Sequence, residues 1–296
     1  RTAHIRDVGG SNPSSATKFM KNKSKIILVF GECVIDIHEN FEIVAGAPLH
    51  IAINLKKCGF SPFLVSGIGN DVNGKRILKL LKKFKISNKY IDIKNKLKTG
   101  IAYVKTKKNE NTFKVDKYSA WDEINKIPNF IPDLLYTSSI AFRSNTSLKK
   151  LSKILKKKIK YIFFDINLRK PYVNWDFIEF LISKKITHLK ITKNEYRYIK
   201  NKSKNKFLIK NLFKINKKLK FVILTKGKDG AEMYFKNGTI IYDNKTKNKK
   251  INNTVGAGDV FSSLMIAGIL RKDDSIQTFT KAIIASEKSI FKKTSY

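Results

Sequence analysis

Cysteine is scarce in this 296-residue sequence, which contains only Cys33 and Cys58. Two cysteines cannot build a disulfide framework or a cysteine-based metal cluster, and a reducing, cytoplasmic location is expected. No apolar run approaches the roughly 18 residues that a spanning helix needs, so we expect no membrane association. Walker A and G-x-G-x-x-G sequences are also missing, which excludes the commonest nucleotide-binding loops.

Acidic residues are few: the sequence contains 23 Asp and Glu but 61 Lys and Arg, which gives a net charge of +38. Such an excess usually suggests a nucleic-acid or anionic membrane partner. Only seven of the basic residues are arginine, however, and the lysines are spread along the whole chain. Arginine is the preferred reader of phosphates and bases. This pattern is more typical of a genome-wide drift in base composition than of a surface that binds nucleic acid, so we expect no nucleic-acid partner.

The first part of the chain differs from the rest. Residues 1–19 lack apolar periodicity and contain a run of small, loop-forming residues at 9–15. Met20 is followed by polar residues and then by an apolar run. We therefore expect residues 1–19 to be a disordered or non-native extension, and residues 20–296 to form one α/β domain, for which the length is sufficient.

The sequence Gly256-Ala257-Gly258-Asp259 precedes an apolar run at 260–270. Small residues before such a run predict a tight turn that feeds a helix N-terminus, where unpartnered N–H groups and the helix dipole attract anions. A carboxylate beside bound phosphate needs its own role, and accepting a proton from an attacking hydroxyl is the natural one. Taken alone, these four residues fit better a simple turn with Asp259 as the N-cap.

Two further apolar runs predict buried parallel strands that end in polar residues. Residues 26–30 are followed by Asp36, and residues 161–165 by Asn167 and Arg169. Ligands of α/β folds bind at the carboxyl ends of such strands. Arg169 could position a phosphate there, and a structural pairing with Asp165 or another acid is an equally good interpretation.

Local patterns predict several other elements. Apolar spacing indicates helices that end near residues 57 and 83 and a last helix over about 275–292. Residues 101–104 and 112–115 form a hairpin pattern. A second hairpin is predicted around Asn237-Gly238.

Several blocks of the sequence resemble the ribokinase-like (PfkB) sugar kinases. Residues 254–259 resemble the C-terminal motif D-T-x-G-A-G-D, residues 31–36 resemble G-E-x-x-x-D, and residues 45–50 resemble G-G-A-P-x-N. Residues 165–169 match the D-x-N-x-R of the fructokinase branch. The blocks follow the family order from about residue 26 to the C-terminus.

The resemblance implies a ribokinase-like three-layer sandwich with a mostly parallel central sheet. It also implies a small β-sheet lid, with strands within about 36–46 and 99–118, through which a homodimer could form. The implied activity is ATP- and Mg²⁺-dependent phosphorylation of a sugar hydroxymethyl group, with fructose as the first candidate. Another sugar or a nucleoside (2-keto-3-deoxygluconate, ribose, adenosine) and a catalytically decayed regulator are the alternatives.

The family pattern also assigns roles to individual residues. Asp259 is implied as the general base and Gly256, Ala257 and Gly258 as the anion hole. The implied sugar contacts are Asp36, Gly46, His50, Asn167 and Arg169. The implied nucleotide contacts are Asn194, Thr225, Gly227 and Gly230.

Four positions depart from the family pattern. Ala45 stands where the family has the first glycine of a lid hinge, and His50 stands where it has a sugar-binding asparagine. Counted from Asn194, the glutamate of the N-x-x-E block is replaced by Arg197, while Glu195 is expected to face elsewhere. Asn253 replaces an aspartate that helps to bind a monovalent cation, which weakens the expectation of K⁺ activation. The chain also ends earlier than is usual in the family.

Overall fold

The computed structural model describes residues 25–107, 110–242 and 256–289. Within these ranges, a large sheet has the strand order β13-β12-β11-β10-β9-β8-β1-β4-β5. Its strands are β1 (Ile27–Phe30), β4 (Phe63–Gly69), β5 (Ile91–Lys94), β8 (Leu134–Ser138), β9 (Tyr161–Asp165), β10 (His188–Thr192), β11 (Phe221–Thr225), β12 (Ala231–Phe235) and β13 (Gly238–Tyr242). The pairs from β5 to β11 are all parallel, and the hairpin of β12 and β13 completes one edge.

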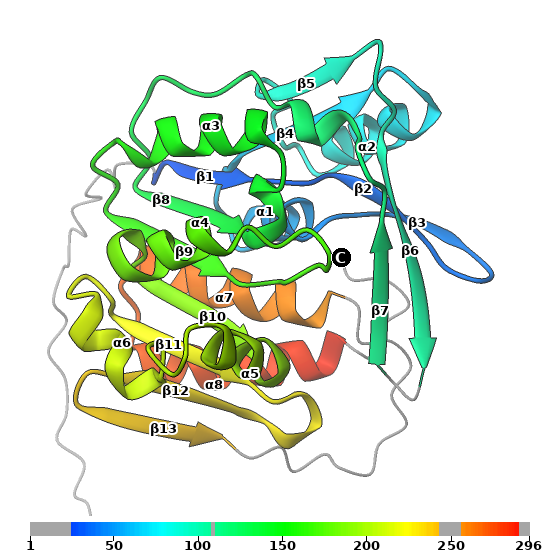
Figure 1. The fold of residues 1–296 in the computed structure, drawn as a ribbon. Helices are drawn as coiled ribbons and strands as arrows, with labels where there is room; N and C mark the ends of the chain where they lie inside the picture. The colour runs from blue at the N-terminus through cyan, green and yellow to red at the C-terminus, as the bar shows by residue number, and fades with distance from the viewer. Residues whose placement is uncertain (1–24, 108–109, 243–255, 290–296) are drawn as a thin grey trace, which may run out of the picture.

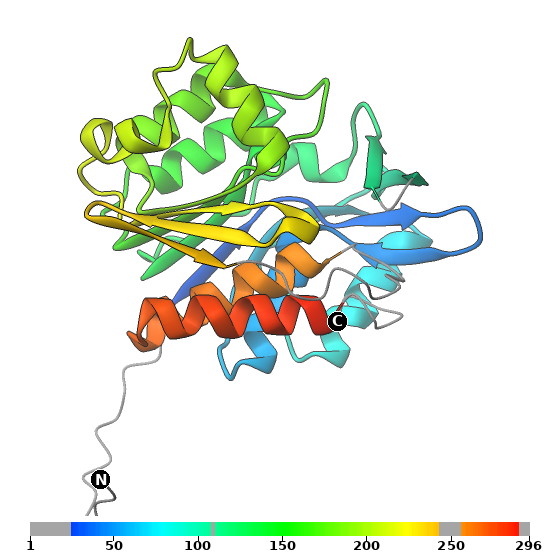
Figure 2. The same cartoon turned by 90° about the horizontal axis from the view of Figure 1, so that it is seen from below.

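Helices cover both faces of this sheet (Figures 1 and 2). One face is covered by α1 (Ala47–Lys57), α2 (Val72–Lys83), α7 (Ala257–Arg271) and α8 (Ser275–Ser289). The other is covered by α3 (Asn145–Leu155), α4 (Trp175–Phe180), α5 (Lys193–Lys202) and α6 (Ile209–Ile215). The arrangement confirms the predicted three layers.

The apolar strand β1 explains why the sheet must be covered on both sides. Ile27 and Val29 belong to the hydrophobic cluster that includes α1 and α7 residues, whereas Leu28 and Phe30 belong to the cluster on the opposite face. All four side chains are fully buried. Successive side chains of a strand point to opposite faces, so a continuous apolar run requires two cores.

A smaller sheet projects beyond the carboxyl ends of the large sheet (Figure 1). Its order is β3 (Glu42–Ala45), β2 (Val34–Ile37), β6 (Gly100–Lys107) and β7 (Glu110–Val115). The predicted hairpin of 101–104 and 112–115 corresponds to β6 and β7, which pair antiparallel. Strand β2 joins the sheet in parallel to β6. We call this small sheet the lid.

The ends of the other elements largely match the predictions. Helix α1 ends at Lys57 and α2 at Lys83, while α8 is described as far as Ser289. The second predicted hairpin exists, but Gly238 is already the first residue of β13 and pairs with Phe235. Across the described ranges, no helix combines the length and apolar character needed to cross a bilayer.

Candidate active site

The first turn of α7 lies at the carboxyl edge of the large sheet. Gly256 adopts a left-handed φ of 81°, which is strained for any residue with a Cβ, and it is the residue that caps the helix. Asp259 is therefore the third residue of α7 and not its N-cap. The N–H groups of Ala257 and Gly258 belong to the first helical turn, where intrahelical acceptors are missing. This turn can bind an anion.

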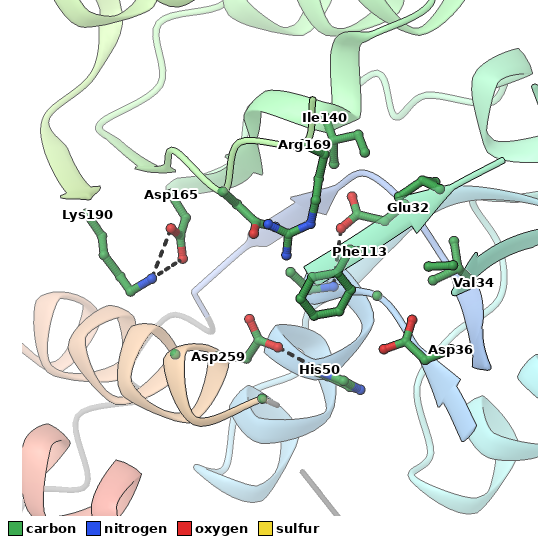
Figure 3. A pocket seen from close by; sticks show the side chains of 17 residues that line it. Glu32, Val34, Asp36, His50, Phe113, Ile140, Asp165, Arg169, Lys190 and Asp259 are labelled. Atoms are coloured by element: carbon green, nitrogen blue, oxygen red, sulfur yellow. Dashed lines mark hydrogen bonds and ion pairs between the residues drawn. The ribbon is translucent and has the colours of Figure 1, made fainter. Parts of the chain in front are cut away.

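A pocket lies between this turn, the carboxyl ends of the parallel strands and the lid (Figure 3). Parallel strands place their carboxyl ends at one edge, so residues far apart in the sequence meet here. The pocket is lined by Glu32, Val34, Asp36, Gly46, Ala47, His50, Ala102, Phe113, Val115, Ile140, Asp165, Asn167, Arg169, Lys190, Gly256, Gly258 and Asp259.

His50 and Asp259 are in direct contact. Nδ1 of the His50 ring lies 2.8 Å from Oδ2 of Asp259 (Figure 3). His50 comes from the first turn of α1 and is 3% exposed, while Asp259 is 16% exposed. Burial lowers the pKa of His50, but the hydrogen bond and charge of Asp259, with Asp36 and the Val44 backbone, outweigh it and leave this pKa raised.

A second buried ion pair lies beneath the same helix end. Nζ of Lys190 on β10 lies 3.0 and 2.9 Å from the two carboxylate oxygens of Asp165 on β9. Ser262 of α7 also donates to Asp165, at 3.1 Å. Burial lowers the pKa of Lys190, but Asp165 outweighs it and leaves the pKa raised. A Cβ placed on Gly258 would lie 3.4 Å from Nζ, so this cation sits against the α7 N-terminus.

Two carboxyl groups lie on the other side of the pocket. Glu32 follows β1 and accepts a hydrogen bond from the Ala47 N–H at 3.3 Å, and burial raises the pKa of its carboxyl to about 7. Asp36 projects from β2 of the lid and is 5% exposed. Burial raises the pKa of Asp36 to about 6, although His50 and Arg169 oppose this shift.

Arg169 connects the large sheet to the lid. Its guanidinium carbon lies 4.3 Å from the centroid of the Phe113 ring on β7. Its Nη1 donates to the Leu168 carbonyl, and its charge lowers the pKa of both Glu32 and Asp36. The sequence left open whether Arg169 positions a phosphate or pairs with Asp165 or another acid. Asp165 binds Lys190 instead, and the acids on which the charge of Arg169 acts are Glu32 and Asp36.

The residues assigned to the nucleotide lie outside this pocket, farther along the same sheet edge. Thr225 ends β11 and is paired in register with Thr192 of β10. Gly227 and Gly230 follow it in a turn with positive φ values of 61° and 86°. Asn194 lies in the first turn of α5.

The acidic position near the start of α5 belongs to Glu195. Its side chain and that of Thr192 form a capping box, and Oε1 also accepts from the Leu168 N–H at 2.8 Å. The charge of Glu195 acts on both Asp165 and Lys190. The capping box folds Glu195 back toward the strand ends, where its two carboxylate oxygens accept from the backbone N–H groups of Leu168 and Thr192. Arg197 lies one half-turn farther along α5.

Most of the predicted sugar and anion-hole residues meet in the pocket. Asp36, Gly46, His50, Asn167, Arg169, Gly256, Gly258 and Asp259 line it, and Ala257 lies between two of them. Ala45 ends β3 and packs in a small cluster at the base of the lid. Asn253 lies outside the described residues.

Other lining residues were given no role from the sequence. Lys190 lies in the buried strand β10, and its position between Leu189 and Ile191 is the only local signal of its burial. Phe113 lies in a predicted strand, but the face of the lid on which its side chain lies depends on how the lid strands pair. The lid residues Val34, Ala102 and Val115 and the loop residue Ile140 give this side of the pocket an apolar wall.

The sequence of this chain also matches known proteins. The model of the pfkB family carbohydrate kinases matches residues 19–294. An ATP-dependent 6-phosphofructokinase of Thermoanaerobacterium thermosaccharolyticum is 26% identical over 272 residues, covering 84% of this chain and 83% of that protein.

Solved structures share the fold. A sugar kinase of Pyrococcus horikoshii superposes with a TM-score of 0.76 at 21% identity, covering 92% of this chain and 93% of the other. A fructokinase variant from Vibrio cholerae, solved with fructose, ADP and potassium, gives a TM-score of 0.76 at 18% identity over 92% of this chain and 94% of its own. These structural matches confirm the predicted ribokinase-like architecture of a large and a small sheet.

Proposed function

The chain belongs to the pfkB family of carbohydrate kinases, and we propose that it transfers the γ-phosphoryl group of ATP to a hydroxymethyl group of a neutral sugar, with fructose as the first candidate. One observation supports this most directly. The anion-binding first turn of α7 and the carboxylate of Asp259 open into the same pocket as Asp36 of the lid. A hydroxyl held by Asp36 and a phosphoryl group held by the helix turn would therefore meet beside a base.

The proposed step needs few protein groups. The sugar oxygen attacks the γ-phosphorus, the bond from this phosphorus to the ADP oxygen breaks, and Asp259 accepts the hydroxyl proton. The N–H groups of Ala257 and Gly258 and the cation of Lys190 stabilise the charge on the transferred group. Positioning and electrostatics dominate phosphoryl transfer, so these groups suffice in principle.

We assign the nucleotide contacts to Thr225, Gly227, Gly230 and Asn194. In support, Thr225 ends β11 in register with Thr192 of β10, after which α5 begins with Asn194 in its first turn. Mg²⁺ enters with ATP in this proposal, because it is usually held by phosphates, waters and one or two carboxylates. Across the described ranges, no group of three or more His, Cys, Asp or Glu side chains is arranged to hold a metal by itself.

The charge balance of the pocket favours an uncharged sugar. Asp165 is neutralised by Lys190, which leaves Arg169 and His50 against the acids Glu32, Asp36 and Asp259. Among the described residues, the lid wall adds only apolar side chains, without a lysine or arginine to bind a second phosphate. Although one relative is a 6-phosphofructokinase, the side chains that line the pocket provide no excess of positive charge to attract a sugar phosphate or sugar acid.

The apolar wall also supports a second candidate, a nucleoside such as adenosine. Val34, Ala102, Phe113, Val115 and Ile140 could cover a flat base that fructose lacks. The ribose hydroxymethyl group would then take the place of the sugar hydroxyl beside Asp259. Both candidates use the same transfer chemistry.

Coupled ADP release separates these possibilities. The full chain would be tested with ATP, Mg²⁺ and fructose, fructose 6-phosphate, ribose, 2-keto-3-deoxygluconate or adenosine. We expect turnover with one uncharged acceptor and a decrease in kcat of about 10²- to 10⁴-fold in Asp259→Asn, because the proton acceptor is lost. Asp273→Asn makes the same chemical change at an exposed position and should retain full activity.

Two results would contradict the proposal. Turnover of fructose 6-phosphate alone would refute the argument from pocket charge. A folded chain that binds ATP but phosphorylates none of the acceptors would favour a decayed regulator.

A further inference from the structure

His50 has a neighbour that its expected role does not explain. A sugar-binding side chain would present its polar atoms to the ligand, yet Nδ1 of His50 lies 2.8 Å from Asp259 Oδ2. The two residues are 209 positions apart, and they come from the first turns of α1 and α7. The contact is buried on the His50 side, where the side chain is 3% exposed.

The chemistry of the two groups fixes the direction of this hydrogen bond. An ionised carboxylate only accepts, so Nδ1 of His50 must donate its proton to Asp259. The Val44 backbone raises the pKa of His50, as a carbonyl acceptor does. The raised pKa favours the imidazolium form of the ring, and Asp259 and Asp36 compensate its charge.

We propose that His50 is a positioning residue for Asp259. The His50 ring holds Oδ2 of the Asp259 carboxylate so that Oδ1 faces the hydroxyl group to be phosphorylated. This inference rests on the proposed function, in which Asp259 is the general base. In the resembling sugar kinases the same position is an asparagine, so this chain would replace a neutral amide by a charged ring. The role differs from sugar binding because His50 acts through Asp259.

The proposal predicts a specific pH dependence. The groups that face His50 are Asp259 on α7, Asp36 on β2 and the Val44 backbone of β3. Arg169 acts in turn on Asp36, and Glu32 interacts with Asp259. A raised histidine pKa means that the charged pair is present at low pH and is lost as the pH rises through that pKa. The neutral ring can still donate from Nδ1, so we expect the charge of the pair, but not its hydrogen bond, to be lost as the pH rises, and kcat to decrease only to the level of His50→Asn.

Two amide variants provide a matched test. The Nδ2 of asparagine occupies the same place on the side chain as Nδ1 of histidine, whereas glutamine places its amide one bond farther out. His50→Asn should keep kcat within about 3-fold and lose the alkaline decrease, because a neutral donor still holds Asp259. His50→Gln should lower kcat by about 10- to 100-fold with a smaller change in KM, because the carboxylate is misplaced.

A measurement independent of turnover distinguishes this inference from the proposed function. The pKa of His50 would be followed by NMR of the ring Cε1–H in the wild type and in Asp259→Asn, with the His50→Asn spectrum used for assignment. We expect the His50 pKa to fall in Asp259→Asn, while that of His188, which burial lowers to about 3, stays unchanged.

An unchanged His50 pKa in Asp259→Asn would overturn the inference. So would an equal increase in KM with unchanged kcat in both His50 variants, which would assign the ring to sugar binding. By contrast, a shifted His50 pKa together with full turnover by Asp259→Asn would establish the pair and refute the general base.

Discussion

The two ends of the pocket are built in different ways. The transfer end consists of Asp165, Lys190 and residues 256–259, which come from adjacent central strands and from α7. The lid end consists of Val34, Asp36, Ala102, Phe113 and Val115, which come from the small sheet. The transfer end is dominated by buried charged groups that contact one another. The lid end is dominated by apolar side chains and has one carboxylate.

This difference suggests a division of labour. Lys190 and Asp259 each have a buried ionic partner and lie on elements packed into the main core. The lid is joined to the large sheet by contacts such as Phe113 on Arg169. We expect changes at the transfer end to alter kcat and stability together, and changes at the lid end to alter mainly KM.

The largest effect is expected for Lys190→Met. Removing the cation leaves Asp165 buried without its ionic partner, which should lower the free energy of unfolding by about 3–5 kcal/mol. Urea denaturation followed by circular dichroism would measure this change.

The double variant Lys190→Met/Asp165→Leu sharpens the comparison. Replacing both members of a buried pair by apolar groups is often neutral, so we expect most of the lost stability to return. kcat should stay at least about 10-fold low, because the cation beside Gly258 is still missing. If the double variant recovers kcat, the pair is only structural and the contrast between the two ends fails.

A smaller effect is expected for Asp36→Asn at the lid end. Exchanging a charged acceptor for a neutral amide should raise the sugar KM by roughly 10-fold at pH 8, with little change in kcat. Burial raises the pKa of Asp36 to about 6, so its charge is lost as the pH falls through this value. In the wild type the KM should rise between pH 7 and about pH 5, whereas in Asp36→Asn it should stay flat. A pH-independent wild-type KM would contradict this role.

The sequence was more informative about the transfer loop than about the charges around it. Gly256, Gly258 and Asp259 are neighbours in the chain, so the turn chemistry is visible locally. The contact of Lys190 with Asp165 spans 25 residues and that of His50 with Asp259 spans 209. Such pairs depend on strand order and helix packing, which no local pattern specifies.

Glu195 illustrates a contact whose local part was visible in the sequence. Spacing counted from Asn194 pointed to Arg197, but the capping pair at the start of α5 is Thr192 and Glu195. Thr192 followed three residues later by glutamate is a capping-box pattern, so the sequence did contain the signal. The role of Glu195 in starting α5 is therefore visible in the sequence, whereas its contact with the Leu168 N–H is not.

The smallest effect is expected for Phe113→Leu, which tests the connection between the two ends. The Phe113 ring stacks on the Arg169 guanidinium at 4.3 Å, and a cation–π contact of this kind contributes about 0.5–1 kcal/mol at a partly exposed site. Leucine keeps the apolar surface and removes the π face. We expect the sugar KM to rise about 2- to 5-fold, because the closed lid is less stable, while kcat stays nearly constant.

Two matched variants make this small effect interpretable. Phe113→Tyr keeps the aromatic face and should retain the wild-type KM. Phe180→Leu makes the same change on α4, where the ring is 39% exposed and lies outside the pocket lining, and should have no effect on KM. A lower kcat in Phe113→Leu would mean that the lid also positions Arg169 for transfer. In that case the two ends of the pocket are coupled, and selection and chemistry cannot be assigned to separate sheets.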